Sequence, residues 1–287
     1  MMPFLCLYPE TLREAIRTLT EEHTDAILLA GGTDVLVRMK RGEINPPVLL
    51  NLKRIGGLDR IERSDGGLTL GALTTIACVE RSPLVRQSHP VLAQSAAVLG
   101  SPSIRHLATL GGNVGRASPA ADTVPALIVQ KARVLLEGPL GKREMEIEGF
   151  FKGPGQTWLS PGEIITSIYL PDPAPGTGAT YVKLGRREGG DCALVGVAAS
   201  LALSGSKVID ARLALASVAP VPLRARNAED VLLSGSINEE RLKEAARVSS
   251  QDSSPISDLR AGAEYRRQMV EVLTYRALNS AWRQARG

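Results

Sequence analysis

Apolar positions recur along this chain with two different spacings, and together they predict strands that alternate with helices. Near the N-terminus, short apolar segments at 4–7, 26–29 and 48–51 predict strands. Apolar residues at helical spacing predict helices over 9–19 and 35–40. This order indicates a β-α-β unit at the start of the chain.

The central part of the chain predicts a second layer of strands and short helices. Segments 58–63 and 68–70 form a predicted strand pair around a Ser-Asp-Gly-Gly turn. Pro125 limits the apolar stretch 120–129 to short helical pieces. The remaining elements follow from the same patterns: helices over 76–80, 90–99 and 104–108, a hairpin of 131–137 with 143–147, and a strand over 164–170.

A proline- and glycine-rich stretch, Pro171 to Gly178, is the clearest linker and predicts a domain boundary. After it, strands come first and helices last. The predicted strands are 179–184, 193–203 and 208–217, and the predicted helices are 228–233, 238–248 and 261–286. This order is typical of an α+β domain.

Composition narrows the class of protein. The chain has 287 residues, of which 44% are hydrophobic and 22% charged, as in globular proteins of one or two domains. The net charge of +4 comes without a dense basic block, which argues against nucleic acid as a partner. We expect no membrane span, because no run of about eighteen apolar residues occurs, and no signal peptide, because the N-terminus lacks a basic start.

Cysteine and histidine are sparse. Cys6, Cys78 and Cys192 lie far apart in the sequence, so they cannot by themselves form a four-cysteine metal or iron–sulfur site. An odd, scattered set suits a reducing compartment, and we expect a cytoplasmic protein. The three histidines have no metal-ligand spacing, and we expect surface or turn positions for them.

Two double-glycine segments carry the candidate chemistry. Ala30-Gly-Gly-Thr-Asp34 lies between a predicted strand and a predicted helix, and Thr109-Leu-Gly-Gly-Asn113 follows some eighty residues later. Bare backbone amides at such turns bind anions, and a phosphate or pyrophosphate is the simplest ligand. A single glycine pair is more often only a turn, and neither the dinucleotide fingerprint nor the P-loop motif is present. We expect Asp34 to cap the following helix, since like charges keep it from phosphates.

Five motifs occur in a defined order: AGGTD, TLGGN, Ser118-Pro-Ala-Ala-Asp122, Pro161-Gly-Glu-Ile-Ile165 and Tyr181-Val-Lys-Leu-Gly-Arg-Arg187. In this order they make the chain similar, over nearly its whole length, to the FAD-binding medium subunits of molybdenum hydroxylases. This is the family of the carbon monoxide dehydrogenase medium chain and the flavin segment of xanthine dehydrogenase.

The resemblance implies an α+β fold. Residues 1–173 would form an FAD-binding domain of the vanillyl-alcohol-oxidase (PCMH) type, built from two α+β subdomains. Residues 178–287 would form a smaller α+β domain like the C-terminal domain of the carbon monoxide dehydrogenase flavoprotein.

The resemblance also implies a set of cofactor-binding residues. These are Leu28, Leu29, Ala30, Gly31, Gly32, Thr33, Asp34 and Val35 in a first pyrophosphate loop, Thr109, Leu110, Gly111, Gly112 and Asn113 in a second loop, and Asp122, Ile165 and Lys183 beyond them. Asp122 would bind a ribose or ribityl hydroxyl. Lys183 would lie near the flavin pyrimidine edge, where a cation raises the reduction potential; a surface lysine at a strand edge is the alternative. For Ile165, core packing is an equal alternative.

The FAD is expected to be non-covalent, because no His or Cys is clearly placed for a covalent link; His106, before the second loop, is the only local candidate. Both loops are expected to offer amide donors to the pyrophosphate, with Thr33 and Thr109 adding hydroxyl bonds.

In the family that the chain resembles, the flavin subunit does not oxidise the organic substrate. A large partner subunit holds the molybdenum–pterin cofactor, and a small partner subunit carries two [2Fe–2S] clusters. The resemblance therefore implies electron transfer through FAD to an external acceptor, in a dimer of heterotrimers. The cysteine count agrees with clusters on another chain, and no cysteine-bearing insertion of the 4-hydroxybenzoyl-CoA reductase type is present.

Two other functions remain open at this point. A stand-alone flavoenzyme of the same fold needs its own acid or base near the flavin, and the sequence offers no convincing candidate. A scaffold subunit that has lost FAD conflicts with the intact glycine segments and Asp122. The pair Arg186-Arg187 either shapes the docking of a partner or acceptor or lies on a solvated surface.

Overall fold

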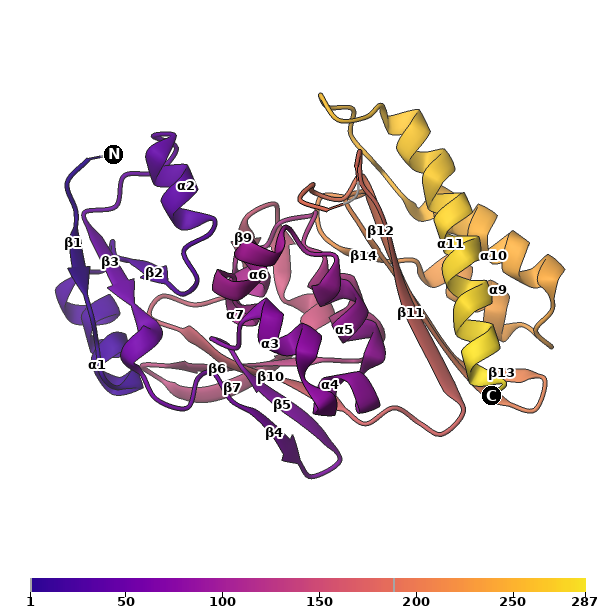
Figure 1. Ribbon diagram of the computed structural model, residues 1–287, viewed down its shortest axis with the longest axis horizontal. Helices are drawn as coiled ribbons and strands as arrows, with labels where there is room; N and C mark the ends of the chain where they lie inside the picture. The colour runs from indigo at the N-terminus through magenta and orange to yellow at the C-terminus, as the bar shows by residue number, and fades with distance from the viewer. Residues whose placement is uncertain (1, 188) are drawn as a thin grey trace.

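A computed structural model describes residues 2–187 and 189–287 (Figure 1). The chain begins with a small parallel sheet in the order β1-β3-β2. Its strands are β1 (Leu5–Leu7), β2 (Ile27–Leu29) and β3 (Val48–Asn51), and β3 is fully buried in the centre. Helix α2 (Val35–Lys40) follows β2, and the 3₁₀ turn η2 (Leu52–Arg54) follows β3. The predicted β-α-β unit is confirmed.

The first predicted helix differs in its bounds. The helix α1 (Leu12–Arg17) begins only after Thr11, whose side-chain oxygen accepts the amide N–H of Glu14. It then continues as a π-helical turn η1 (Thr18–Glu22) beyond the predicted end at residue 19. A capping threonine fixes the helix start more strongly than the proline at position 9.

The second subdomain is built on an antiparallel sheet of order β4-β5-β10-β6-β7. Its strands match the predicted segments: β4 (Ile61–Ser64), β5 (Gly67–Gly71), β6 (Arg133–Gly138), β7 (Gly141–Glu146) and β10 (Ile164–Pro171). The 3₁₀ turn η3 (Ile147–Gly149) and the small hairpin of β8 (Phe151–Gly153) and β9 (Gln156–Thr157) were not predicted.

Short helices pack against this sheet. They are α3 (Ile76–Arg81), α4 (Pro83–Ser88), α5 (Pro90–Ala97), α6 (Pro102–Leu107), α7 (Leu110–Gly115) and α8 (Thr123–Val129). Sequence analysis missed α4 and the helical form of α7. Pro125 is tolerated because it lies in the first turn of α8, where the backbone N–H that proline lacks would have no intrahelical acceptor.

His89, between α4 and α5, departs from the expected surface position. It lies at a turn but is only 2% exposed, and its Nδ1 is 2.8 Å from the side-chain oxygen of Gln130. Burial lowers the pKa of His89, so the neutral imidazole is favoured.

The C-terminal domain is a four-stranded antiparallel sheet covered by three helices. The strand order is β11-β12-β13-β14, and Figure 1 places helices α9, α10 and α11 on its outer face. The elements are β11 (Thr177–Leu184), β12 (Val195–Ser204), β13 (Lys207–Ala216), β14 (Leu223–Arg224), α9 (Arg226–Leu233), α10 (Glu239–Asp252) and α11 (Ala263–Ala285). The predicted strands-then-helices order is confirmed.

The two domains share hydrophobic core across their boundary. Along β12, Val195, Val197 and Leu201 pack under the C-terminal helices, as strand alternation requires. The opposite face of the sheet presents Ala198 and Ala214 to the core of the preceding domain. Small side chains at this contact let β12 and β13 approach helix α8 closely, so the domains meet at a fixed interface.

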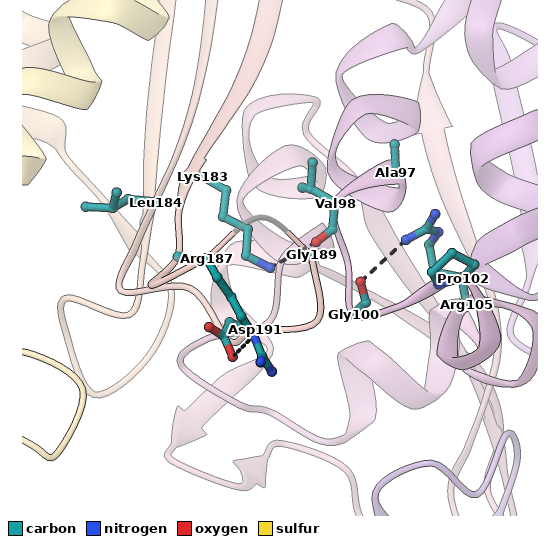
Figure 2. Close-up of a pocket in the computed structure, with 11 residues that line it drawn as sticks. Ala97, Val98, Gly100, Pro102, Arg105, Lys183, Leu184, Arg187, Gly189 and Asp191 are labelled. Atoms are coloured by element: carbon teal, nitrogen blue, oxygen red, sulfur yellow. Dashed lines mark hydrogen bonds and ion pairs between the residues drawn. The ribbon is translucent and has the colours of Figure 1, made fainter.

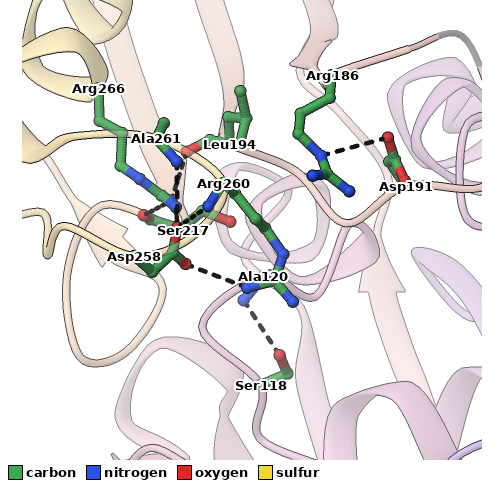
Figure 3. A network of polar contacts seen from close by, with 10 residues as sticks. All are labelled: Ser118, Ala120, Arg186, Asp191, Leu194, Ser217, Asp258, Arg260, Ala261 and Arg266. Carbon is green, nitrogen blue, oxygen red and sulfur yellow. Dashed lines mark hydrogen bonds and ion pairs between the residues drawn. The ribbon is translucent and has the colours of Figure 1, made fainter.

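The connection between α10 and α11 is held by a buried arginine (Figure 3). Arg266 is 3% exposed and donates to the carbonyl oxygens of Leu194 and Ser217 and to the carboxylate of Asp258. Burial acts to raise the pKa of Asp258. The amides of Arg260 and Ala261 and the guanidinium of Arg266 outweigh it and lower the pKa to about 2.

Asp258 is therefore expected to link stability to acid pH. A carboxylate with a depressed folded pKa stabilises the protein above its unfolded value, here 3.8, and this stabilisation is lost as the pH falls toward about 2. We expect the melting temperature of Asp258→Asn to fall less between pH 5 and pH 2 than that of the unmodified chain. Thermal melts between pH 5 and pH 2 check this, and equal slopes for both proteins would refute it.

Candidate cofactor site

The two glycine segments lie against each other. A Cβ on Gly31 would stand 2.1 Å from the carbonyl oxygen of Leu107 and 2.9 Å from Cα of Ala108, just before the second segment. A Cβ on Gly112 would lie 3.8 Å from Cβ of Ala30. The structure thus brings the segments around residues 31 and 109 into direct backbone contact, and only glycine fits at position 31.

The first segment presents unpaired backbone donors. Gly32 has φ of 78°, and the chain then enters α2. Among the hydrogen bonds of residues 2–187 and 189–287, none uses the amide N–H groups of Gly31 to Val35, while Gly32 and Asp34 accept helical bonds through their carbonyls. Half-buried amides without partners at a glycine turn form a concave nest for an anion.

The second segment corrects the expected loop. Thr109 is the N-cap of helix α7, so Leu110 to Asn113 are helical. Their amides are already used: Leu110 donates to Thr74, Gly111 to Ala72, Gly112 to the Thr109 hydroxyl and Asn113 to the Thr109 carbonyl. Among the described residues, no hydrogen bond uses the backbone N–H of Thr109, so this segment keeps one amide donor of the expected set. Its further donors are the Thr109 hydroxyl proton and the Asn113 side-chain amide.

Asp34 does not cap α2, which corrects a second expectation. It occupies the N-cap position but has helical backbone angles, and its side chain accepts no capping hydrogen bond. Its Oδ2 lies instead 2.8 Å from Nε of Arg116, at the end of α7. An ion pair to the second segment has replaced the local cap.

Asp122 and Lys183 form a buried ion pair between the two domains. Nζ of Lys183, on β11, is 2.8 Å from Oδ2 of Asp122, and the side chains are 9% and 6% exposed. Lys183 also donates to the carbonyl oxygen of Val98 at 3.0 Å. The other Asp122 oxygen accepts the hydroxyl of Tyr181 at 2.9 Å. The alternative of a surface lysine at position 183 is excluded.

Burial dominates the electrostatics of this cluster. It raises the pKa of Asp122, although Lys183 and Tyr181 act in the opposite direction. Burial and the neighbouring carboxylate raise the pKa of Tyr181 well above its ordinary value, so Tyr181 stays a hydrogen-bond donor. Asp122 therefore has one uncharged donor, Tyr181, and one charged donor, Lys183.

The remaining predicted residues lie between the glycine segments and the ion pair of Asp122 and Lys183, or pack beneath the segments. The hydroxyl of Thr123, next to Asp122, donates to Oδ1 of Asn113 at 2.6 Å. The Cδ1 atom of Ile165 lies 3.3 Å from the Cβ position of Gly115, so Ile165, which is 8% exposed, packs beneath α7. Leu29 and Leu110 are buried, and Leu28 packs against the core between α1 and β3. These leucine side chains thus pack into the core beneath the glycine segments.

A cleft of about 690 Å³ opens beside the ion pair, between the two domains (Figure 2). Val98, Gly100 and Arg105 line it from the N-terminal part of the chain, and Lys183, Arg187 and Asp191 line it from the C-terminal domain. Arg187 borders it and pairs with Asp191 at 3.4 Å. The cleft is open to solvent, and Lys183 is one of the residues that line it.

Sequence analysis missed two residues of the site. Tyr181 stands two positions before Lys183 on one strand, and the alternation of strand side chains puts both on the same face, so a signal was available. Arg116 had no such signal, because its partner Asp34 is distant in sequence. His106 lies in α6, where its Nδ1–H donates to the carbonyl oxygen of Pro102.

Comparison with known proteins decides the family. The model described as "FAD binding domain in molybdopterin dehydrogenase" matches residues 2–173, and "CO dehydrogenase flavoprotein C-terminal domain" matches residues 179–281. The chain belongs to this family of FAD-binding subunits. The resemblance seen in the five motifs is confirmed, and so is the fold class.

Members of the FAD-binding subunit family match over nearly their full length. The carbon monoxide dehydrogenase medium chain of Hydrogenophaga pseudoflava is 35% identical over 96% of this chain and 95% of its own. The glyceraldehyde dehydrogenase medium chain of Sulfolobus acidocaldarius is 32% identical over 93% and 94%. The solved structure of carbon monoxide dehydrogenase from Hydrogenophaga pseudoflava superposes with a TM-score of 0.96 at 36% identity, covering 99% of each chain.

Two kinds of feature are absent from the described residues. No helix within 2–187 and 189–287 has the length and apolar character to cross a bilayer. In the same part of the chain, no group of three or more His, Cys, Asp or Glu side chains is arranged to hold a metal ion, and Cys6, Cys78 and Cys192 are free thiols.

Proposed function

We propose that this FAD-binding subunit is the electron-transfer chain of a heteromeric molybdenum hydroxylase. It would take electrons from two [2Fe–2S] clusters of a small partner subunit and pass them through non-covalent FAD to an external acceptor. A large partner subunit would hold the molybdenum–pterin cofactor and the substrate. A dimer of such heterotrimers and a cytoplasmic location are part of this proposal.

The observation that carries the proposal is the amide nest at Gly31 to Val35, packed on the second glycine segment. FAD is an extended ligand with a doubly charged pyrophosphate, and unpaired half-buried N–H groups gain charge-assisted hydrogen bonds from it. Because α7 uses its own amides, we assign the pyrophosphate chiefly to the first segment. The Thr109 hydroxyl and the Asn113 amide would add contacts from the second.

The ion pair of Asp122 and Lys183 fits the other end of the ligand. A bound FAD supplies one- and two-electron redox chemistry. Lys183 holds a positive charge in a buried position beside the cleft, which favours negative charge on a ring placed there. Asp122 keeps free lone pairs on both oxygens and can accept a ligand hydroxyl beside its protein donors. Ile165 would act through α7 rather than by polar contact.

The names of the relatives support a substrate site on another chain. They include carbon monoxide dehydrogenase and glyceraldehyde dehydrogenase, whose substrates share little chemistry, and in both cases the similar chain is called the medium chain. A subunit that is alike across such different reactions fits a shared electron-transfer step. The cleft at Lys183, which is open to solvent, is the place where we expect the external acceptor to approach.

A visible absorption spectrum of the protein, co-purified with its native partners, tests the proposal. Flavin bands together with broad iron–sulfur absorbance, and two further chains on a gel, are expected. A lone yellow chain that an organic substrate bleaches would replace the proposal with a stand-alone flavoenzyme. A colourless chain that stays colourless with added FAD would replace it with a scaffold subunit.

The basic pair at the cleft edge has a test of its own. The side chains of Arg186 and Arg187 are 57% and 73% exposed, and both lie near Asp191. If they guide a partner or acceptor, Arg186→Glu with Arg187→Glu lowers the rate constant for acceptor reduction by about tenfold at low salt and less at high salt. Stopped-flow kinetics at two ionic strengths measure this. Unchanged kinetics and unchanged subunit assembly would show that the two arginines guide neither a partner nor an acceptor and only form part of a solvated surface.

A further inference from the structure

An ion pair joins the first glycine segment to the end of α7, the helix that begins in the second segment. Oδ2 of Asp34, at the start of α2, lies 2.8 Å from Nε of Arg116, which follows the last residue of α7. Both atoms are shielded from solvent, although the side chains as wholes are 41% and 35% exposed. The N–H and the carboxylate are not aligned as a hydrogen bond, so the contact is Coulombic.

The guanidinium of Arg116 also lies close to the turn between β8 and β9. A Cβ built on Gly155 in this turn would stand 3.1 Å from a terminal nitrogen of Arg116. The amide of Gly155 donates in turn to the carbonyl of Ala117, next to Arg116. Asp34 has a second cation in Arg38, but that contact is 3.9 Å and lies within α2. Arg116 is thus the cation that couples the first segment to the second.

The position and the charge of Asp34 both affect the binding of an anion at the first glycine segment. Asp34 belongs to the same short stretch as the unpaired amides of Gly31 to Val35, and its carboxylate opposes any anion bound there. The contact of Gly31 with Leu107 aligns the two segments but carries no charge. An arginine paired with Asp34 neutralises the carboxylate and also holds α2 on α7.

From this arrangement we infer that Arg116 is a positioning residue for the cofactor. It acts through Asp34, by cancelling the negative charge beside the pyrophosphate nest and by fastening the first glycine segment to the second. The inference rests on the proposed function, since it concerns the affinity for FAD. It concerns a residue outside the five motifs.

A set of four variants of the full chain tests it, with FAD affinity measured by quenching of flavin fluorescence. Arg116→Gln is expected to weaken FAD binding by roughly tenfold, because Asp34 is left uncompensated. Arg116→Lys, which keeps the charge, is expected to recover most of that loss. Asp34→Asn alone is expected to change the affinity by about threefold or less, because it removes both the ion pair with Arg116 and the repulsion between the carboxylate and the pyrophosphate.

The double variant Asp34→Asn with Arg116→Gln decides between mechanisms. If Arg116 acts through Asp34, the double variant binds FAD about as well as Asp34→Asn. If it binds as poorly as Arg116→Gln, then Arg116 contacts the cofactor directly and the inference is overturned. An unchanged affinity of Arg116→Gln overturns it as well.

Controls separate folding from binding. Arg133→Gln removes an ion pair of similar exposure on the hairpin of β6 and β7 and is expected to leave FAD affinity unchanged. Melting temperatures without FAD show whether a variant is folded, and Arg116→Lys provides a milder change if Arg116→Gln is not. If the unmodified chain binds no FAD, the proposed function fails; if it binds FAD and the variants do not differ, only this inference fails.

Discussion

Gly31→Ala is expected to abolish stable FAD binding. The added Cβ would stand 2.1 Å from the carbonyl oxygen of Leu107, and both partners are backbone, so neither can move aside as a flexible side chain would. The first glycine segment must therefore shift away from α6 and α7. A shift of this size moves every amide of the nest off the pyrophosphate, and we expect affinity to fall by about two orders of magnitude.

The measurement is the FAD content of the purified variant together with its affinity in titration. Overpacking of this kind also destabilises the fold by about 1–3 kcal/mol, so the melting temperature is recorded alongside. Gly56→Ala is the matched control, because no heavy atom lies within 4 Å of the Cβ position there. A Gly31→Ala protein that retains FAD at the level of the control would show that the two segments need not touch.

Local pattern was sufficient for most of the fold. The apolar segments predicted the three N-terminal strands and the strands and helices of the C-terminal domain, because each of these elements buries one continuous face. The small hairpin of β8 and β9 was not predicted, because its strands are too short to show an alternation of apolar and polar residues. Helix α4 escaped because Ser82 and Pro83, which start it, resemble a simple break in α3.

The cofactor-binding residues stay a prediction, and the contacts among them did not follow from the sequence. The motif order identified Gly31, Thr109, Asp122 and Lys183, and the structure links the segments that carry them by direct contacts. The helical form of α7 depends on Thr109 as a cap and on Ala72 and Thr74 as acceptors, which lie on another segment. The pairing of Asp34 depends on a residue far away in sequence. Neither follows from local spacing.

The largest effect on stability is expected at the interdomain ion pair. Lys183→Met removes the cation and leaves the Asp122 carboxylate buried with only Tyr181 as a side-chain donor. Leaving a buried charge uncompensated costs about 3–5 kcal/mol, and the cost falls on the contact between the two domains. We expect unfolding in urea at lower concentration, and the C-terminal domain to loosen from α5 and α8.

The pH dependence of this loss identifies its cause. Burial already raises the pKa of Asp122, and in Lys183→Met the ammonium no longer opposes that rise. A carboxyl group whose folded pKa exceeds its unfolded value stabilises the fold in acid, and this contribution disappears as the pH rises through the folded pKa. The deficit of the variant should therefore be smallest near pH 4 and full at alkaline pH. A deficit that does not change with pH would point to lost packing.

A double variant separates charge from cofactor chemistry. Asp122→Asn with Lys183→Met leaves no buried charge and should regain most of the stability, because paired removal avoids an uncompensated ion. Lys183→Met alone should lower the midpoint potential of bound FAD, because it leaves the Asp122 carboxylate without its cation, whereas the double variant removes both charges together and should restore most of the potential. An unchanged potential in Lys183→Met would mean that Lys183 only fastens the domains and that the flavin ring lies elsewhere.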